Sequence, residues 1–244
     1  MDKVITIIKF IAIAIPCFFI ATGCHELGHV ITGLLNKWKF VYFTTGPLTV
    51  YRENINSKIK VTFTKDLMSW FGFSATIPDN DRAENGDVFA KILIGGPIGS
   101  FVTSLIFLAL YLLTRTDFCA LTAMFAAGQG FATALPVNVR TGAVNNDGMR
   151  FRYIRKGGKK GAEEKAAFLI AVKRMISPES PSDEELVKVM TDSDDIITRF
   201  GGLSYAKRNA SILKDEERLA ALKSQMALIE DKIPASVKAA YGEI

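Results

Sequence analysis

The sequence predicts a mainly α-helical membrane protein. We expect three transmembrane helices, a small β-rich insertion after the first helix, and a soluble α-helical C-terminal region. Of the 244 residues, 49% are hydrophobic and 23% are charged, and the two kinds are separated along the chain. Residues 92–114 and 118–139 carry no charged side chain, whereas charges are dense from Arg140 onward. Apolar runs of this length are typical of helices that cross a bilayer, and they exclude an ordinary soluble domain or a disordered chain.

The predicted transmembrane segments span residues 4–35, 89–113 and 118–136. The first could be a cleaved signal peptide. However, its apolar character continues past the expected cleavage point and no Ala-x-Ala site follows, so we predict a retained helix. It would be ~48 Å long against ~30 Å of hydrocarbon, so it must tilt, bend at Pro16 or emerge at one end. The short link at residues 114–117 predicts that the second and third helices form an antiparallel hairpin.

Basic residues predict the topology. The loop at residues 37–87 and the stretch at residues 150–160 are both rich in Lys and Arg, whereas Lys3 and Arg115 fall on the opposite side. The positive-inside rule therefore places the C-terminus in the cytosol. The net charge is +5, but no nucleic-acid-binding motif accompanies it, so we expect no nucleic-acid partner. We expect anionic lipid to contact the basic stretch, which comprises Arg150, Arg152, Arg155, Lys156, Lys159 and Lys160.

Alternating apolar residues in the loop at residues 37–87 predict a small sheet. Residues 48–51 and 58–63 have strand periodicity, with a turn at residues 53–57 between them, and a weaker strand signal lies near residues 40–43. Trp70, Phe71 and Phe73 follow as an aromatic cluster. They could form the core of this sheet, anchor the chain at the membrane interface, or do both.

Residues 151–244 predict a cytosolic helical region. Residues 162–176 and 215–233 have apolar positions at helical spacing. Ser182 followed by Glu185 is typical of a capping box at the start of another helix. We expect Pro178, Pro181 and the Gly201-Gly202 pair to separate these elements.

The motif His25-Glu26-Leu27-Gly28-His29 lies inside the first apolar segment and contains both histidines of the chain. Residues four apart share one face of a helix, so the two imidazoles can reach one metal ion. Zinc prefers such ligands and, in catalytic sites, takes three from the protein and leaves one position for water. Glu26 is placed to take a proton from that water. Ionisable groups inside apolar segments are costly and usually functional, which favours a Zn²⁺ site here.

A third zinc ligand must come from elsewhere in the chain. Asp147, in Asn145-Asn146-Asp147-Gly148, follows the third apolar segment and lies on the same side of the membrane as the cytosolic half of the first helix. Because Asn-Asp-Gly is also typical of an ordinary turn, the residues alone leave this assignment open. The other candidates look like solvated charges; they are Glu53, Asp66, Asp79, Asp81, Glu84 and Asp87.

Together these residues resemble the site-2 protease family of intramembrane zinc metalloproteases, over about residues 1–150. The matching elements are the His25–His29 motif, Gly96-Pro97 in the second segment, Leu135-Pro136 closing the third, and Asp147-Gly148. The resemblance implies a metalloprotease core in which His25, His29 and Asp147 bind zinc and Glu26 is the catalytic acid and base. It also implies an integral, multi-pass protein of a bacterial inner or plasma membrane.

The chain departs from the family pattern in two places. Many members have Asn where this chain has Ser100, and many have the Asp-Gly close behind the Leu-Pro, whereas residues 137–146 intervene here. These departures leave open how substrate is handled and where the third ligand lies.

The predicted function is zinc-dependent endopeptidase activity on peptide bonds in or near transmembrane segments of membrane protein substrates, in regulated intramembrane proteolysis. One alternative is a non-proteolytic membrane adaptor whose zinc site is structural or vestigial. Another is a soluble zinc peptidase with an apolar N-terminus. The sequence predicts neither substrate-binding residues nor an oligomeric state.

Overall fold

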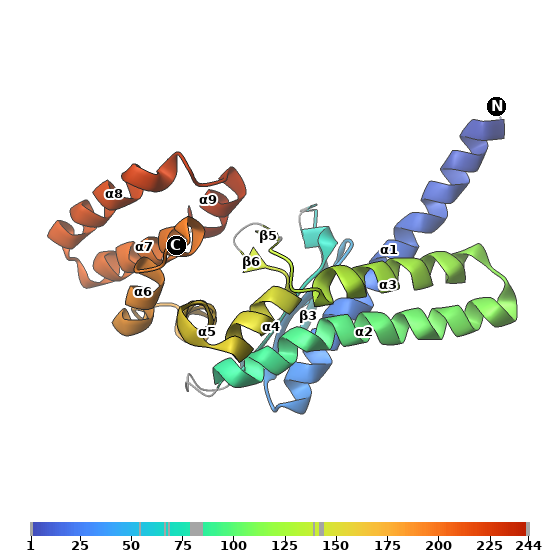
Figure 1. Cartoon of the computed structure of the whole chain (residues 1–244), viewed down its shortest axis with the longest axis horizontal. Helices are drawn as coiled ribbons and strands as arrows, with labels where there is room; N and C mark the ends of the chain where they lie inside the picture. The colour runs from blue at the N-terminus through green and yellow to red at the C-terminus, as the bar shows by residue number, and fades with distance from the viewer. Residues whose placement is uncertain are drawn as a thin grey trace. The chain divides into compact units, whose positions relative to one another are not determined.

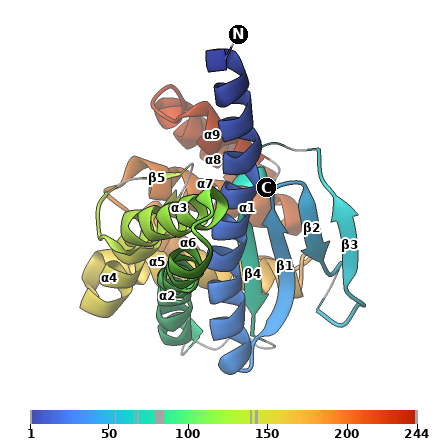
Figure 2. The same cartoon turned by 90° about the vertical axis from the view of Figure 1, so that its right-hand side faces the viewer.

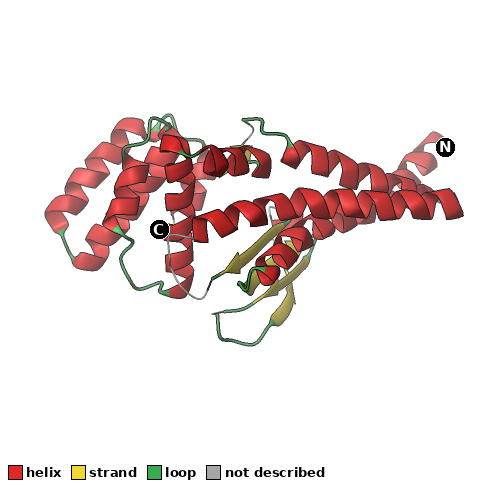
Figure 3. Cartoon of the chain, turned by 60° about the horizontal axis from the view of Figure 1, so that its bottom comes forward, coloured by secondary structure: helices red, strands yellow, loops and turns green. Residues whose placement is uncertain are grey.

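The computed structural model describes residues 2–53, 55–65, 67, 69–78, 85–138, 140–141 and 144–242. It is 71% helical with a small antiparallel sheet, which confirms that part of the predicted fold class (Figures 1 and 3). The chain forms two compact units. Unit 1 comprises residues 1–79 and 88–136, and unit 2 comprises residues 80–87 and 137–244.

Unit 1 is built around one long helix. In Figure 2 the sheet lies along one side of α1, with α2 and α3 on the other side. The elements of the unit, in chain order, are α1 (Asp2–Leu35), β1 (Lys39–Thr45), β2 (Leu48–Tyr51), β3 (Lys60–Phe63), the 3₁₀ helix η1 (Ser69–Phe71), β4 (Phe73–Ile77), most of α2 (Asn85–Thr114) and α3 (Asp117–Ala134).

Helix α1 continues through Pro16 for 34 residues, or ~51 Å at 1.5 Å per residue. Its C-terminus is closed by two backbone bonds: Lys37 N–H donates to Leu34 O, and Trp38 N–H donates to Gly33 O, both at 3.0 Å. Lys37 takes the left-handed conformation (φ 64°) that this type of helix end requires. The buried Trp38 then directs the chain into β1.

Helices α2 and α3 form the predicted antiparallel hairpin. Ring contacts join Phe107 to Phe118 and Phe101 to Phe131, so later residues of α3 meet earlier residues of α2. α3 ends at Ala134 rather than at Pro136 as predicted. The physical reason is that the residue before a proline disfavours helical angles, and Leu135 is extended (φ −67°, ψ 128°).

Glycines allow α1 and α2 to approach closely. A Cβ added at Gly28 would lie 2.2 Å from Gly95 O, and one added at Gly99 would lie 2.7 Å from Cys24 O. No side chain fits where a Cβ would lie so close to a backbone oxygen of the other helix. The glycines therefore let the two backbones come into contact, as is common between helices that pack in lipid. Gly95 and Gly99 therefore serve the close packing of α2 on α1.

Among the described residues, two helices are long and apolar enough to cross a membrane, at Lys3–Leu35 and Asn85–Thr114. Length and composition are weak evidence by themselves, because soluble core helices and signal sequences share them. α3 is not one of the two: its 18 residues are long enough, but Asp117 and Gln129 lower its mean hydropathy. The third predicted span therefore gains no support from this criterion.

The sheet has the strand order β3-β2-β1-β4, and all neighbours are antiparallel. The β2–β3 pairing, with Val50 opposite Val61, confirms the predicted hairpin, and β1 confirms the weaker strand near residues 40–43. β4 was not predicted. It pairs with β1 across a register irregularity between Phe40 and Tyr42, which lets Phe40 and Phe43 face the same side.

The aromatic cluster does not form the interior of the sheet. Trp70 packs edge-on against Phe19 of α1, with ring centroids 5.9 Å apart. Phe71 and Phe73 are more than half exposed. The alternative of an interfacial anchor therefore stays a prediction.

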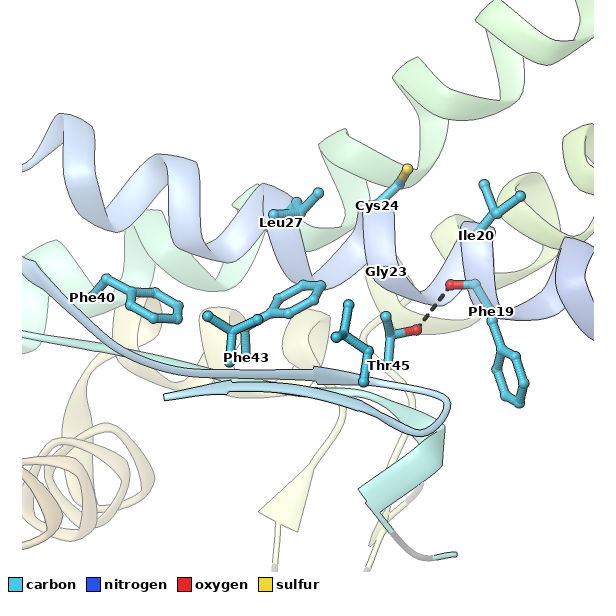
Figure 4. Close-up of a pocket in the computed structure, with 10 residues that line it drawn as sticks. Phe19, Ile20, Gly23, Cys24, Leu27, Phe40, Phe43 and Thr45 are labelled. Atoms are coloured by element: carbon cyan, nitrogen blue, oxygen red, sulfur yellow. Dashed lines mark hydrogen bonds between the residues drawn. The ribbon is translucent and has the colours of Figure 1, made fainter. Parts of the chain in front are cut away.

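A pocket of about 540 Å³ separates α1 from β1 and β2. Figure 4 shows Phe19, Gly23 and Leu27 on the helix side and Phe43 and Thr45 on the strand side. The Thr45 hydroxyl donates to Phe19 O at 2.8 Å and so ties the end of β1 to α1. This bond satisfies the one hydroxyl group among the described residues that line the pocket.

Unit 2 is a helical bundle preceded by a short two-stranded ladder. Its buried core joins α5, α6, α7 and α8 through Ile170, Val187, Leu203 and Leu222, among others. The elements are β5 (Arg140–Thr141), β6 (Val144–Asn145), α4 (Asp147–Lys156), α5 (Gly158–Ile176), α6 (Glu184–Thr191), α7 (Ile196–Leu213), α8 (Glu216–Glu230) and α9 (Ala235–Gly242).

Polar groups fix the connection between α5 and α6. The fully buried Asn209 accepts from Ser182 N at 2.7 Å and donates to Ser182 O and Glu184 Oε1. Arg218 also donates to both carboxylate oxygens of Glu184 and is the main reason that the pKa of this carboxyl is lowered. Because the pKa of Glu184 is lower in the folded protein, its pairing with Arg218 stabilises unit 2 at neutral pH. That stabilisation is lost as the pH falls through the folded pKa of Glu184.

Two predictions for unit 2 were wrong. The cap of α6 is Asp183, which accepts from Glu185 N and Leu186 N, and not Ser182. Gly201 and Gly202 lie inside α7 rather than between elements. A Cβ at Gly202 would lie 2.5 Å from Thr191 N, so this glycine serves the close packing of α7 on α6.

Candidate metal centre

The two histidines of the motif lie one turn apart on α1, as their spacing predicts. His25 is buried, at 3% exposed, and His29 is partly buried. Their Nε2 atoms lie 3.3 Å apart, and the rings are nearly perpendicular, with an interplanar angle of 86°. The two nitrogens therefore converge on one point beside the helix.

The outer nitrogen of each ring is already engaged. His25 Nδ1 lies 2.9 Å from Ser100 Oγ, and His29 Nδ1 lies 2.8 Å from Ile92 O. Ile92 O only accepts, and its 2.8 Å contact with His29 Nδ1 is shorter than the 3.3 Å contact between Gly96 N and the same nitrogen. The geometry therefore favours a proton on His29 Nδ1, which leaves the neutral ring with a lone pair at Nε2. With Ser100 accepting from His25 Nδ1, both rings would present lone pairs at Nε2. Such outer contacts are typical of metal-binding histidines.

Two observations fit a metal ion at this point. Two nitrogens bound to one tetrahedral zinc at ~2.0–2.1 Å lie ~3.3–3.4 Å apart, which matches the 3.3 Å between the Nε2 atoms. A Cβ added at Gly96 would lie 2.2 Å from His29 Nε2 and 2.7 Å from His25 Nε2. Glycine at this position therefore keeps clear the space in front of both nitrogens.

Asp147 completes a group of three possible ligands. One ligand atom each of His25, His29 and Asp147 lies within 4.8 Å of the others, so this cluster could hold a metal ion. Asp147 is the first residue of α4, and Asn146 caps the helix by accepting from Met149 N at 3.0 Å. The Asn-Asp-Gly sequence is therefore a helix start rather than an isolated turn.

Glu26 lies on the adjacent edge of the same turn of α1 and is partly buried. Its Oε2 accepts from Ser74 Oγ at 2.6 Å, and Ser74 belongs to β4. This short contact fixes one carboxylate oxygen. The other, Oε1, would lie 3.3 Å from a Cβ added at Gly72, whose positive φ of 92° suits glycine. β4 and the residue before it therefore shape the surroundings of Glu26.

The contact between Ser74 and Glu26 was not predicted from the sequence. The signal was present, since Phe73, Ala75 and Ile77 alternate with Ser74 and Thr76. The contact of Ser100 with His25 also went unpredicted, because Ser100 stood out only as a departure from a family pattern.

The other acidic candidates do not join this group where the structure describes them. Glu53 pairs with Lys60 at 2.5 Å, and Asp87 pairs with Lys165 at 2.7 Å. Both carboxylates are mostly exposed, as expected of solvated charges. Asp66, Asp79, Asp81 and Glu84 lie outside the described residues.

Replacing Ser100 with alanine should weaken zinc binding by about 10-fold to 100-fold, because His25 loses the partner that orients its ring. The measurement is competition with a chromophoric chelator on purified protein. Ser104→Ala is the matched control, since Ser104 lies one turn further along α2 and donates to Ala123 O instead. Equal affinities for the two variants would contradict an orienting role for Ser100.

Comparisons with protein-family models, with curated proteins and with solved structures give no match for this chain. A function must therefore be inferred from the geometry of its own residues.

Proposed function

We propose that this protein is a zinc-dependent intramembrane endopeptidase that cleaves peptide bonds in or near the transmembrane segments of membrane protein substrates. The observation that carries the proposal is the pair of converging Nε2 atoms, 3.3 Å apart, with a carboxylate of Asp147 in the same cluster and Glu26 beside them. A structural zinc site has no use for a base such as Glu26, whereas a hydrolytic site requires one.

Exposed apolar side chains support an intramembrane location. In the most apolar stretch of α1, 11% of the residues are buried inside the structure, far fewer than a core helix of a soluble protein would bury. Ile5 and Ile8 of α1 and Leu105 of α2 are examples of such exposed side chains, at 45–66% exposed. Lipid would cover these side chains. We therefore propose an integral, multi-pass protein of a bacterial inner or plasma membrane, with the C-terminus in the cytosol.

His25, His29 and Asp147 would hold the zinc. Bound there, zinc would supply Lewis-acid chemistry, polarising the substrate carbonyl and making a water molecule more acidic. Glu26 takes the proton of the attacking water and then gives it to the leaving amine. Ser74 holds Glu26 Oε2, which leaves Oε1 to carry the proton. Ser100 and Ile92 O fix the two rings during this cycle.

The substrate must present an unwound segment, because a regular helix protects its peptide bonds. Anionic lipid is a proposed second partner for residues 150–160. In this stretch Arg150, Lys159 and Lys160 already pair with acidic side chains. Arg152, Arg155 and Lys156 are exposed and are the residues that we expect to meet lipid headgroups.

Metal removal tests the proposal directly. The purified full chain, reconstituted in liposomes with a single-span substrate, should cleave it, lose cleavage on treatment with a zinc chelator, and regain it when zinc is added back. Stoichiometric zinc without cleavage of any substrate tested would instead favour a membrane adaptor with a structural site. Release of the chain from membranes by alkaline carbonate would favour a soluble zinc peptidase.

A further inference from the structure

A second candidate binding site lies wholly within unit 2. A pocket of about 150 Å³ is formed by α4, α5, α6, α7 and α9 with the segment before α4. On the same measure a water molecule needs about 10–15 Å³, so the pocket has room for a ligand of several heavy atoms. The lining residues that matter here are Asn145, Arg150, Tyr153, Lys160, Glu163 and Tyr241.

Two buried oxygens in the wall of this pocket have no donor among the described residues. Glu163 is 3% exposed and Asn145 is 6% exposed. Within the part of the chain that the structure describes, no donor reaches Glu163 Oε1 or Asn145 Oδ1. The other oxygen of Glu163 accepts from Lys160 Nζ at 2.8 Å. Buried polar atoms are almost always hydrogen-bonded, so these two call for a partner that the described side chains do not supply.

The chemistry of the pocket selects the ligand. Both oxygens accept, so the ligand must donate. Lys160 pairs with Glu163 at 2.8 Å and Arg150 pairs with Glu164 at 3.1 Å, so both carboxylates already have a cationic partner. The remaining negative charge suits a singly charged group better than a divalent metal ion. A primary ammonium group brings one positive charge and three N–H donors. Tyr153 and Tyr241 also line the pocket, and aromatic rings attract cations.

We infer that the unit 2 pocket binds a primary ammonium group through Glu163 Oε1 and Asn145 Oδ1. The group belongs to a small alkylamine or to a lysine side chain of a polypeptide. The unit 2 pocket shares no residue with the metal centre, so the two sites can be tested independently.

Thermal unfolding of the purified full chain in detergent tests the inference. Propylammonium chloride should raise Tm in a saturable way, whereas tetramethylammonium chloride, which has the same charge and no N–H donor, should not. Glu163→Gln and Asn145→Ala should each weaken the apparent affinity for propylammonium by at least about tenfold. Glu179→Gln, an exposed position outside the pocket, should leave it unchanged.

A capped lysine derivative, N-acetyl-lysine amide, distinguishes the two sources. Tighter binding than that of propylammonium supports a polypeptide, and weaker binding supports a free amine. Equal responses to propylammonium and tetramethylammonium would overturn the inference, as would a rise in Tm that does not saturate, or an affinity that both pocket variants retain. If either Glu163→Gln or Asn145→Ala fails to fold, the propylammonium affinity of the other variant tests the inference.

Discussion

Replacing Glu26 with glutamine should lower the rate of substrate cleavage by about 10²-fold to 10⁴-fold, the usual contribution of a positioned acid and base. The amide keeps the size of the side chain and can still contact Ser74, so the surroundings should be preserved. It cannot accept the proton of the attacking water. The loss should therefore fall on kcat rather than on the amount of zinc bound or on Tm.

The measurement compares initial cleavage rates and zinc stoichiometry on the same liposome preparation. Glu53→Gln is the matched control, because it removes another carboxylate of unit 1 that pairs with Lys60 at the surface. Retention of the wild-type rate by the Glu26 variant would exclude the proposed mechanism. Loss of zinc together with activity would instead show that Glu26 acts on the site as a whole.

Local patterns in the sequence predicted the parts of unit 1 that depend on neighbours in the chain. The four-residue spacing of His25 and His29 placed them on one face of α1, and the alternation around Val50 and Val61 predicted the β2–β3 hairpin. In each case the interacting residues belong to one helix or to two strands that follow each other directly in the chain. Periodicity is therefore sufficient to relate them.

Contacts between distant segments were not predictable in this way. Ser74 reaches Glu26 only because β4 pairs with β1, about thirty residues earlier in the chain. Gly96 shows the same limit. Its sequence context indicates close packing, but the space that it leaves before His25 Nε2 and His29 Nε2 depends on how α1 and α2 approach each other.

In unit 2, tertiary packing changes the roles that local sequence patterns predict for two groups of residues. Ser182 and Asp183 are both suitable caps by composition, and Asp183 takes the role because the backbone of Ser182 is bound by Asn209. The Gly201-Gly202 pair has the composition of a break, yet close packing on α6 and on Tyr241 keeps it helical. Tertiary contacts override local preference at both places.

Replacing Asp147 with alanine should lower zinc affinity by at least about 100-fold, or about 2.8 kcal/mol at 1.4 kcal/mol per tenfold change. Two imidazoles would be left as protein ligands, whereas stable zinc sites use three or four. The first turn of α4 should survive, because its cap is Asn146 and not Asp147. The Asp147→Ala variant should therefore lose zinc affinity while it keeps the thermal stability of the metal-free protein.

Two companion variants make this expectation specific. Asp194→Ala removes an exposed carboxylate of unit 2 that pairs with Lys159, and it should leave zinc affinity unchanged. Asp147→His offers a different zinc ligand at the same position and should restore part of the affinity. If Asp147→Ala retains full zinc affinity, the third ligand must come from elsewhere, and the cluster of His25, His29 and Asp147 would not be the metal centre. If affinity is lost and regained in this series, the carboxylate contributes to the site as a ligand rather than as a part of the fold of α4.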